Sequence, residues 1–161
     1  MADTPAFWDD DDFMDSLITL LCTDASTLRQ CGHLFAPDDF KPLRGMKWGQ
    51  QRWNVASAAL EYWQRFHEPV GKMLRSEVLS YAGKTLGQGE RQLQGIRDYL
   101  IHLKGIKVVG PDGVIEKAAG YKRERLKAKA VQEMGQLQAA GELTDQRWRE
   151  ITEQTLVTLD S

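Results

Sequence analysis

The sequence predicts an all-α protein, built from a compact helical head followed by a protruding antiparallel helical hairpin. Apolar residues recur every three or four positions in several segments, which is the spacing of one buried helix face. The segment from about 116 to 140 is rich in alanine, lysine, glutamate, glutamine and leucine, all of which favour helices. Glycines and prolines separate these segments and indicate where one helix ends and the next begins.

Composition indicates one globular domain, with or without an appendage. The 161 residues are 42% hydrophobic and 27% charged, with a formal net charge of −2, so the chain can bury a core and has no global attraction to nucleic acid or membranes. No apolar run approaches the ~20 residues that span a bilayer, and Asp9–Asp12 stand where a signal peptide would be apolar. Cys22 and Cys31 are too few for a disulfide scaffold and suit buried positions in a reducing compartment. We therefore expect a cytoplasmic protein.

The head is expected over residues 12–104, after a flexible acidic arm over residues 1–11. Asp9–Asp12 precede the first apolar positions, and aspartates stabilise the first turn of a helix, where the helix dipole is positive. A break at Thr23–Asp24 precedes a short helix, and Pro37 indicates a further helix start or turn. The buried face of the first helix is expected to consist of Phe13, Leu17, Leu20 and Leu21.

The clearest periodicity lies between Met46 and His67, where apolar positions alternate in steps of three and four. This buried face of a long helix is expected to consist of Met46, Gly49, Trp53, Ala56, Leu60 and Trp63. A shorter helix follows over Val70–Ala82, with Gly83 as its C-cap. The next helix ends at Gly105, and its expected buried face consists of Leu93, Ile96, Leu100 and Leu103.

Residues 105–115 are expected to join the head to the hairpin, as an extended linker or a short two-stranded ribbon. Val108-Val109 and Val114-Ile115 flank Gly-Pro-Asp-Gly, in which proline fixes φ and glycine allows a positive φ, as a turn requires. The hairpin is expected over residues 116–159, with Gly141 between its two helices.

The segment Ser80–Gln92 contains Gly-Lys-Thr, the second half of a phosphate-binding loop. Such a loop needs a further glycine at position 78, which is Val78 here, and it must follow a buried strand. The residues before Gly83 have helical spacing instead, and no apolar strand elsewhere ends in a magnesium-binding aspartate. We therefore expect a connection between helices at Gly83–Thr85, no catalytic residue and no cofactor.

Metal binding has little support in the sequence, and we expect no metal site. His33, His67 and His102 lie at no ligand spacing, and no Cys-x-x-Cys occurs. Asp9–Asp12 lack the alternating spacing and glycine of a calcium loop. A nucleophilic pair between His33 and one of the two cysteines stays open but is less favoured than two buried thiols. We expect His67 to pack at a helix end.

Two of the tryptophans, Trp53 and Trp63, are expected in the core because they lie on the apolar face of the long helix. Trp8 and Trp48 lie off that face. Exposed aromatic side chains most often contact a protein partner.

The strongest cluster of positive charge lies on the helix expected over residues 117–129, where only Glu124 opposes the basic side chains. Such a run is most often a solvated helix face, but it also has the electrostatic character of a nucleic-acid contact. The candidate nucleic-acid contacts are Lys122, Arg123, Arg125, Lys127 and Lys129.

The head carries short features in a recognisable order, which are Leu20-Leu21, Pro37–Phe40, Arg52, Trp53 and Leu60. In this order, and over about Phe13–Leu103, the chain resembles the N-terminal domain of DnaB-type replicative DNA helicases. The last part of the chain is similar only as a helical hairpin. The Val-Val-Gly-Pro-Asp-Gly-Val-Ile segment, Gly49 and Trp48 depart from the family pattern.

The resemblance implies a non-catalytic assembly domain in DNA replication. Such domains form the N-terminal collar of a hexameric helicase, pair through these helices, and offer a surface to primase or a helicase loader, while ATP hydrolysis belongs to a separate domain. We therefore expect a homodimer or a ring of dimers, contact with primase or a loader, and no membrane contact. Either a helicase fragment or a free-standing relative would fit.

The hairpin is the expected oligomer interface, because two helices alone leave part of each apolar face uncovered. The expected interface residues are Leu126, Ala130, Met134, Leu137, Trp148 and Ile151. Two other functions remain open. One is a DNA-binding accessory protein in replication that makes weak contact through the basic helix over residues 117–129, and the less favoured one is a small enzyme whose site the sequence does not reveal.

Overall fold

The computed structural model describes residues 10–42, 45–108 and 110–160, and all regular structure within these ranges is helical. The predicted all-α class is confirmed. The chain divides into two compact units, Met1–Ala119 and Gly120–Ser161. The division falls inside α6 (Pro111–Ala139), which begins in the first unit and continues into the second.

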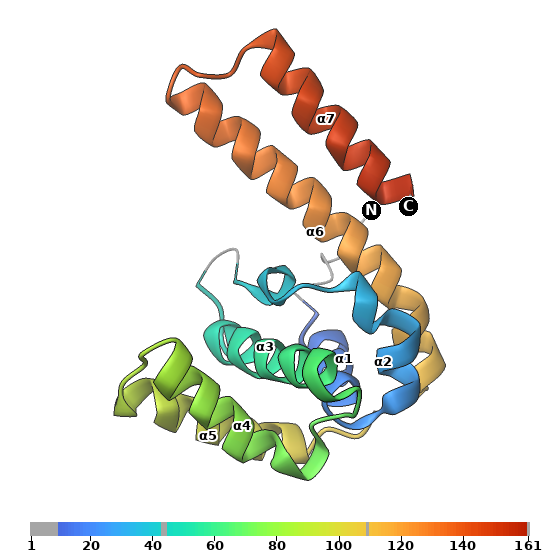
Figure 1. The fold of residues 1–161 in the computed structure, drawn as a ribbon, viewed down its shortest axis with the longest axis vertical. Coiled ribbons are helices and arrows are strands. Elements are labelled where there is room, and N and C mark those ends of the chain that lie inside the picture. Colours follow the sequence, from blue (N-terminus) through green and yellow to red (C-terminus); the bar gives the residue numbers. More distant parts are fainter. Residues whose placement is uncertain (1–9, 43–44, 109, 161) are drawn as a thin grey trace. The chain divides into compact units, whose positions relative to one another are not determined.

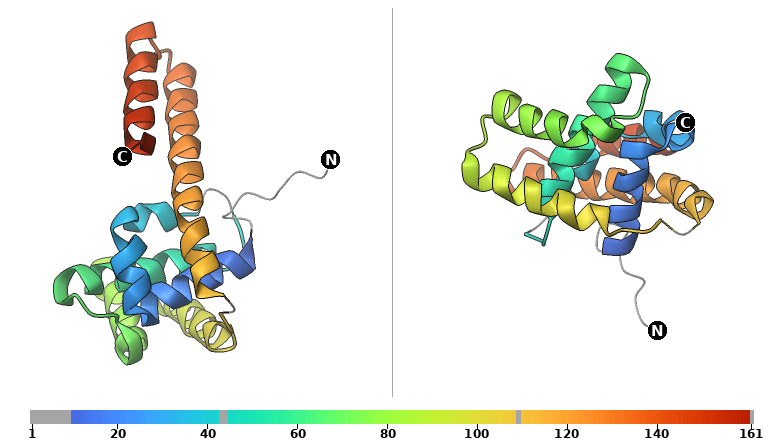
Figure 2. Two further views of the ribbon diagram at one scale, coloured as in Figure 1. Left: turned by 90° about the vertical axis from the view of Figure 1, so that its right-hand side faces the viewer. Right: turned by 90° about the horizontal axis from the view of Figure 1, so that it is seen from below.

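The first unit is organised around one central helix, α3, which contacts α1, α4, α5 and the 3₁₀ turn Pro37–Phe40 (Figure 1). Helices α4 and α5 also contact each other and lie beside α3 (Figure 2). The α-helices before α6 are α1 (Asp11–Thr23), α2 (Ala25–Cys31), α3 (Gly49–Phe66), α4 (Leu74–Ser80) and α5 (Glu90–Lys104).

Aspartate side chains begin the first two helices: Asp10 belongs to the acidic run predicted to cap the first, and Asp24 lies at the predicted break before the second. Asp10 Oδ1 accepts a hydrogen bond from the Phe13 backbone N–H at 3.1 Å. Asp24 Oδ2 accepts from the backbone N–H of Thr27 at 3.2 Å and from its hydroxyl at 2.6 Å. Each carboxylate satisfies an N–H group that has no partner within the helix, so Asp24 ends α1 and begins α2.

The core of the first unit lies where α1, α3 and α5 meet, and its apolar side chains are almost fully buried. The most buried of these are Leu17, Ile18, Leu21, Val55, Ala56, Ala59, Leu60, Ile96 and Tyr99. Helix α3 is buried all round between Asn54 and Leu60, because other helices cover it on several sides. The expected core positions of Trp53 and Trp63 are therefore wrong: both are half-buried, and no single face defines the buried part of the helix.

The Gly-Lys-Thr sequence lies in a π-helical turn, Tyr81–Thr85, that continues α4 without a break. The expected C-cap at Gly83 is wrong, because Gly87 is the residue with positive φ, at 64°. This conformation lets the Gln88 N–H donate to the Ala82 carbonyl at 2.9 Å. The Gln88 side chain then pairs with the buried amide of Asn54, at 3.1 and 3.4 Å, and so fixes the connection to α3. The segment is a connection between helices.

The expected linker or ribbon over residues 105–115 is wrong from Pro111 onward, because α6 already begins there. Proline suits the first position of a helix, where its missing N–H needs no partner, and Asp112 stabilises the same turn through the helix dipole. Val114 and Ile115 are helical for this reason. Val109 lies outside the described residues, and so does Trp8.

The second unit contains the rest of α6 and α7 (Asp145–Asp160), which lie side by side and antiparallel (Figures 1 and 2). Helix α6 ends where the N–H groups of Gly141 and Glu142 donate to the carbonyls of Gln138 and Leu137. An ion pair between Arg147 Nη2 and Glu133 Oε1, 2.9 Å apart, links the two helices. No helix in the described ranges is long and apolar enough to cross a bilayer.

Replacement of Leu60 by alanine tests the burial of α3. Leu60 is 1% exposed, so Leu60→Ala should lower the free energy of unfolding by about 2–5 kcal/mol, from lost burial and the cavity left behind. Leu86 is 42% exposed, and Leu86→Ala should cost less than about 1 kcal/mol. Urea denaturation of both variants measures the difference, and equal costs would contradict this arrangement of the core.

Candidate functional site

A buried carboxylate, Asp15, joins three helices of the first unit. Its Oδ1 accepts from Arg52 Nε at 3.0 Å and from the Tyr99 hydroxyl at 2.7 Å. Its Oδ2 lies 2.9 Å from His102 Nε2. Asp15 belongs to α1, Arg52 to α3, and Tyr99 and His102 to α5, and the side chains of the first two are each only 3% exposed. The sequence analysis missed this polar cluster.

The charges of the polar cluster stabilise one another. Burial by itself would raise the pKa of Asp15, but hydrogen bonds from Arg52, Tyr99 and His102 together with the Arg52 charge bring it below its ordinary value. Burial would lower the pKa of Arg52, but the hydrogen bond and charge of Asp15, together with Tyr99 and Asp11, raise it above its ordinary value. Burial and the Asp15 charge both raise the pKa of Tyr99. The cluster therefore contains a stable carboxylate–guanidinium pair, and Tyr99 stays protonated.

Arg52 extends the polar cluster to the first turn of α1. Its Nη2 donates to Asp11 Oδ1 at 2.9 Å. Its Nη1 is the one buried side-chain nitrogen or oxygen, within the described ranges, for which the structure shows no hydrogen-bond partner. Asp15 accepts from three donors on two other helices, so the cluster holds α1, α3 and α5 together.

Trp48 covers the outer side of the polar cluster. Its ring stacks on His102 with centroids 5.5 Å apart and lies 5.3 Å from the Tyr99 ring. Its backbone is left-handed, with φ 66°, which is uncommon for a bulky residue and turns the chain into α3. The turn also needs Gly49, because a Cβ there would lie 2.9 Å from Met46 Cγ. Trp48, an expected partner contact, is thus half-buried within its own unit.

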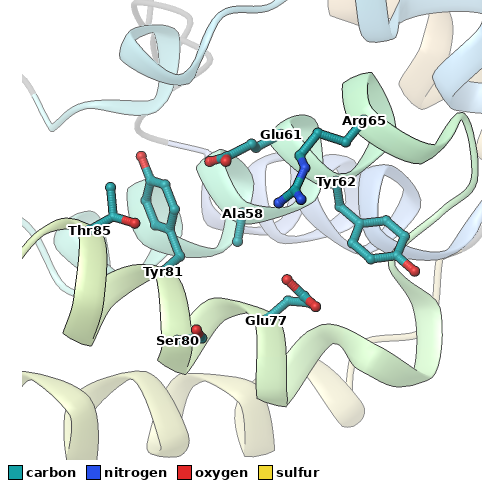
Figure 3. Close-up of a pocket in the computed structure, with 8 residues that line it drawn as sticks. All are labelled: Ala58, Glu61, Tyr62, Arg65, Glu77, Ser80, Tyr81 and Thr85. Atoms are coloured by element: carbon teal, nitrogen blue, oxygen red, sulfur yellow. The ribbon is translucent and has the colours of Figure 1, made fainter.

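A small polar pocket lies between α3 and the segment Glu77–Thr85. Figure 3 shows Glu61 and Arg65 on one side of it and Glu77, Ser80 and Tyr81 on the other. Burial, and then the charge of Glu61, raise the pKa of Tyr81. The volume is about 100 Å³, well below the roughly 300–1,000 Å³ of a typical ligand pocket, so the pocket does not suggest a substrate site.

The six expected interface residues differ in exposure. Trp148 is 50% exposed, whereas Ala130 and Ile151 are buried, and Leu126, Met134 and Leu137 are half-buried. The most exposed large apolar side chains of the second unit, besides Trp148, are Val131 at 66%, Leu156 at 55% and Val157 at 69%. The sequence analysis missed these three, because it followed the buried faces of the helices and not the opposite ones.

The five candidate basic residues of α6 also differ in exposure. Arg123, Lys127 and Lys129 are exposed, and Lys122 is half-buried. Arg125 is only 9% exposed, which makes it the least accessible of the five candidate nucleic-acid contacts. Arg123 and Lys127 are four positions apart and therefore share one face of the helix.

The cysteines and histidines form no reactive arrangement among the residues that the structure describes. Burial raises the pKa of Cys22 to about 12 and of Cys31 to about 11, so both thiols stay protonated. The Cys31 thiol donates to the Thr27 carbonyl at 3.2 Å, and His33 is exposed. His67 caps the end of α3 with φ 54°. No group of three or more His, Cys, Asp or Glu side chains within the described ranges is arranged so that it could hold a metal ion.

Comparison with known proteins gives no family for the chain. It matches no protein-family model, and no curated protein or solved structure is significantly similar to it.

Replacement of Asp15 by asparagine tests the polar cluster. Asp15→Asn leaves the Arg52 charge without its buried partner and should lower the free energy of unfolding by about 3 kcal/mol at pH 7. Because folding lowers the pKa of Asp15, its contribution is present above the ordinary value of 3.8 and is lost as the pH falls further. The difference in free energy of unfolding between the parent and Asp15→Asn should therefore be smaller at about pH 3 than at pH 7.

Urea denaturation at both pH values measures that gap. Asp12→Asn is the matched control, because Asp12 is an exposed carboxylate three residues before Asp15 in the same helix and should change stability by less than about 1 kcal/mol. A gap of equal size at pH 7 and pH 3, or no gap at pH 7, would contradict the assigned role of Asp15.

Proposed function

We propose that the chain is a non-catalytic assembly domain of a DnaB-like replicative helicase, and that its helical hairpin pairs with a second copy. The observation that carries this proposal is the exposure of Val131, Trp148, Leu156 and Val157 in the second unit, each at least half exposed. Val131 belongs to α6 and the other three to α7, and several exposed large apolar side chains on one pair of helices are typical of an interaction surface. Aromatic residues such as Trp148 are the usual anchors of protein interfaces.

A second copy suits this surface because the charges of the hairpin complement themselves. Residues 121–132 carry five basic side chains and one acidic one, whereas residues 133–160 carry six acidic side chains and two basic ones. Two copies related by a two-fold axis can place the basic half of each hairpin against the acidic half of the other. A dimer therefore gains both apolar burial and opposite charges.

The replication role rests on the resemblance of the head to helicase N-terminal domains and on the order of a helical head followed by a helical hairpin. In such an assembly, ATP hydrolysis belongs to another domain, and the head or hairpin offers a surface to primase or a loader. The buried, protonated thiols suit the reducing cytoplasm that this role requires.

A second candidate function is DNA binding by the exposed face of α6. The observation that favours it is the exposure of Arg123, Lys127 and Lys129. Three phosphate contacts give weak, salt-sensitive binding without base recognition. This candidate ranks below self-association because the same basic side chains complement the acidic half of the hairpin.

Truncation of Trp148 tests the proposed interface. Trp148→Ala should weaken dimerisation roughly 10- to 100-fold, as expected for an interface anchor. Phe66→Ala is the matched control: Phe66 is an aromatic residue of the first unit that is 49% exposed, and its loss should leave the mass unchanged. Light scattering across a concentration series measures both variants. Equal masses for parent and Trp148→Ala at every concentration would refute the role of Trp148.

Charge reversal on α6 separates the two candidate functions. A variant with Arg123, Lys127 and Lys129 changed to glutamate should weaken self-association by removing charges that face the partner. Its retention of a fluorescent single-stranded oligonucleotide should equal that of the parent. Unchanged mass together with lost, salt-dependent DNA binding would instead favour the DNA-binding function.

A further inference from the structure

The first unit contains a wide groove, which the sequence analysis did not predict. It lies between α1, the turn over Gly71–Arg75 and α5, and its volume is about 710 Å³. This is in the upper part of the range of roughly 300–1,000 Å³ for ligand-binding clefts. The groove is therefore large enough for several side chains of a bound segment.

The floor of the groove is apolar. Leu100 and Leu103 of α5 and Cys22 of α1 lie there and are at most 8% exposed. Ile101 lines the same groove and is 68% exposed, so a partner that covers it would remove much apolar area from water. The hydroxyl of Thr19, which also lines the groove, donates to the Asp15 carbonyl and so does not compete for a ligand.

The charged residues that line the groove are all basic: Lys72, Arg75, Arg97 and Lys104. Arg97 Nη1 pairs with Glu90 at 2.6 Å. The other three make no ion pair within the described ranges, and Lys72, Arg75 and Lys104 are exposed. The positive charge of the groove rim is opposite in sign to the net charge of the whole chain, which is −2.

The combination selects among ligand classes. Single-stranded nucleic acid needs aromatic side chains on which bases stack, and the groove is lined by none. A small polar metabolite needs convergent hydrogen-bonding groups, and Gln94 supplies the one side-chain amide. An amphipathic helix places apolar anchors on one face and can carry acidic side chains beside them, which satisfies both the floor and the rim.

We propose that this groove binds an acidic amphipathic helix of a partner protein, with apolar side chains against Leu100, Ile101 and Leu103. Its flanking carboxylates pair with Lys72, Arg75 and Lys104. The proposal deepens the interaction function proposed above and rests on it only in that both require a protein partner. The groove lies wholly within the first unit, so its occupation does not depend on the hairpin.

Fluorescence anisotropy with designed peptides tests this proposal on the full chain. The probe is a labelled peptide of about 16 residues, with leucines at helical spacing and glutamates beside them. One comparison peptide has lysine in place of each glutamate, and another has the acidic composition in scrambled order. Saturable binding of the acidic amphipathic peptide alone, weakening with added salt, is the expected result.

Two variants locate the binding. The double variant Lys72→Glu/Arg75→Glu should bind the acidic peptide roughly tenfold more weakly, and so should Ile101→Ser, which removes an apolar contact. Lys84→Glu/Arg91→Glu is the matched control, because both residues are exposed in the same unit but do not line the groove. All changed side chains are exposed, so thermal melting by circular dichroism should match that of the parent.

Several outcomes would overturn the proposal: no saturable binding, equal binding of the lysine peptide, or loss of binding in the control variant. Displacement of the peptide by an oligothymidine would assign the groove to nucleic acid. A reduced oligomer mass for Ile101→Ser would assign it to contact between copies of this chain. Trp148→Ala should retain peptide binding, so failure of the proposed hairpin dimer and failure of the groove are distinguishable.

Discussion

The buried ion pair between Asp15 and Arg52 is the interaction on which the first unit depends. It ties α1 to α3, and the Tyr99 hydroxyl and the His102 ring bring α5 to the same carboxylate. A buried pair of this kind adds little net stability over an apolar contact, but loss of one partner is costly, so it specifies which helices meet. It also holds α1 and α5 where they form two sides of the apolar groove. The polar cluster therefore positions the helices that form the proposed partner surface.

The hairpin follows a different physical principle. Its two helices are too few to cover their own apolar residues, and Trp148, Leu156 and Val157 of α7 remain exposed. Its charges are also unevenly divided, with a basic excess over residues 121–132 and an acidic excess over residues 133–160. Apolar exposure supports the proposal of a partner, and charge asymmetry supports a second copy of the chain as that partner. In the proposed assembly the hairpin joins copies, while the first unit is left to bind another protein.

Local signals in the sequence located the starts of the first two helices, but not the end of the Gly83 segment or the start of α6. Asp10, in the acidic run predicted to cap the first helix, does so, because capping depends on residues only three positions apart. The predicted break at Thr23–Asp24 is where Asp24 caps the second helix. The prediction of a linker or ribbon over residues 105–115 was wrong from Pro111 onward, because Pro111 suits the start of a helix as well as a turn. Trp53 and Trp63 were misplaced because periodicity identifies one buried face, whereas α3 is covered on several sides. The partners of Asp15 lie 37 to 87 positions away, so no local pattern could pair them.

Pairing of hairpins through opposite charges is the central claim, and mixing two charge-reversed chains tests it most directly. One chain carries Arg123→Glu/Lys127→Glu, and the other carries Glu142→Lys/Glu153→Lys, all at exposed positions. Each chain alone should be a monomer, because like charges then face each other across the two-fold axis. Native mass spectrometry of the mixture should show 1:1 heterodimers, in which opposite charges meet again. Monomers in the mixture, or homodimers of either chain alone, would contradict the account.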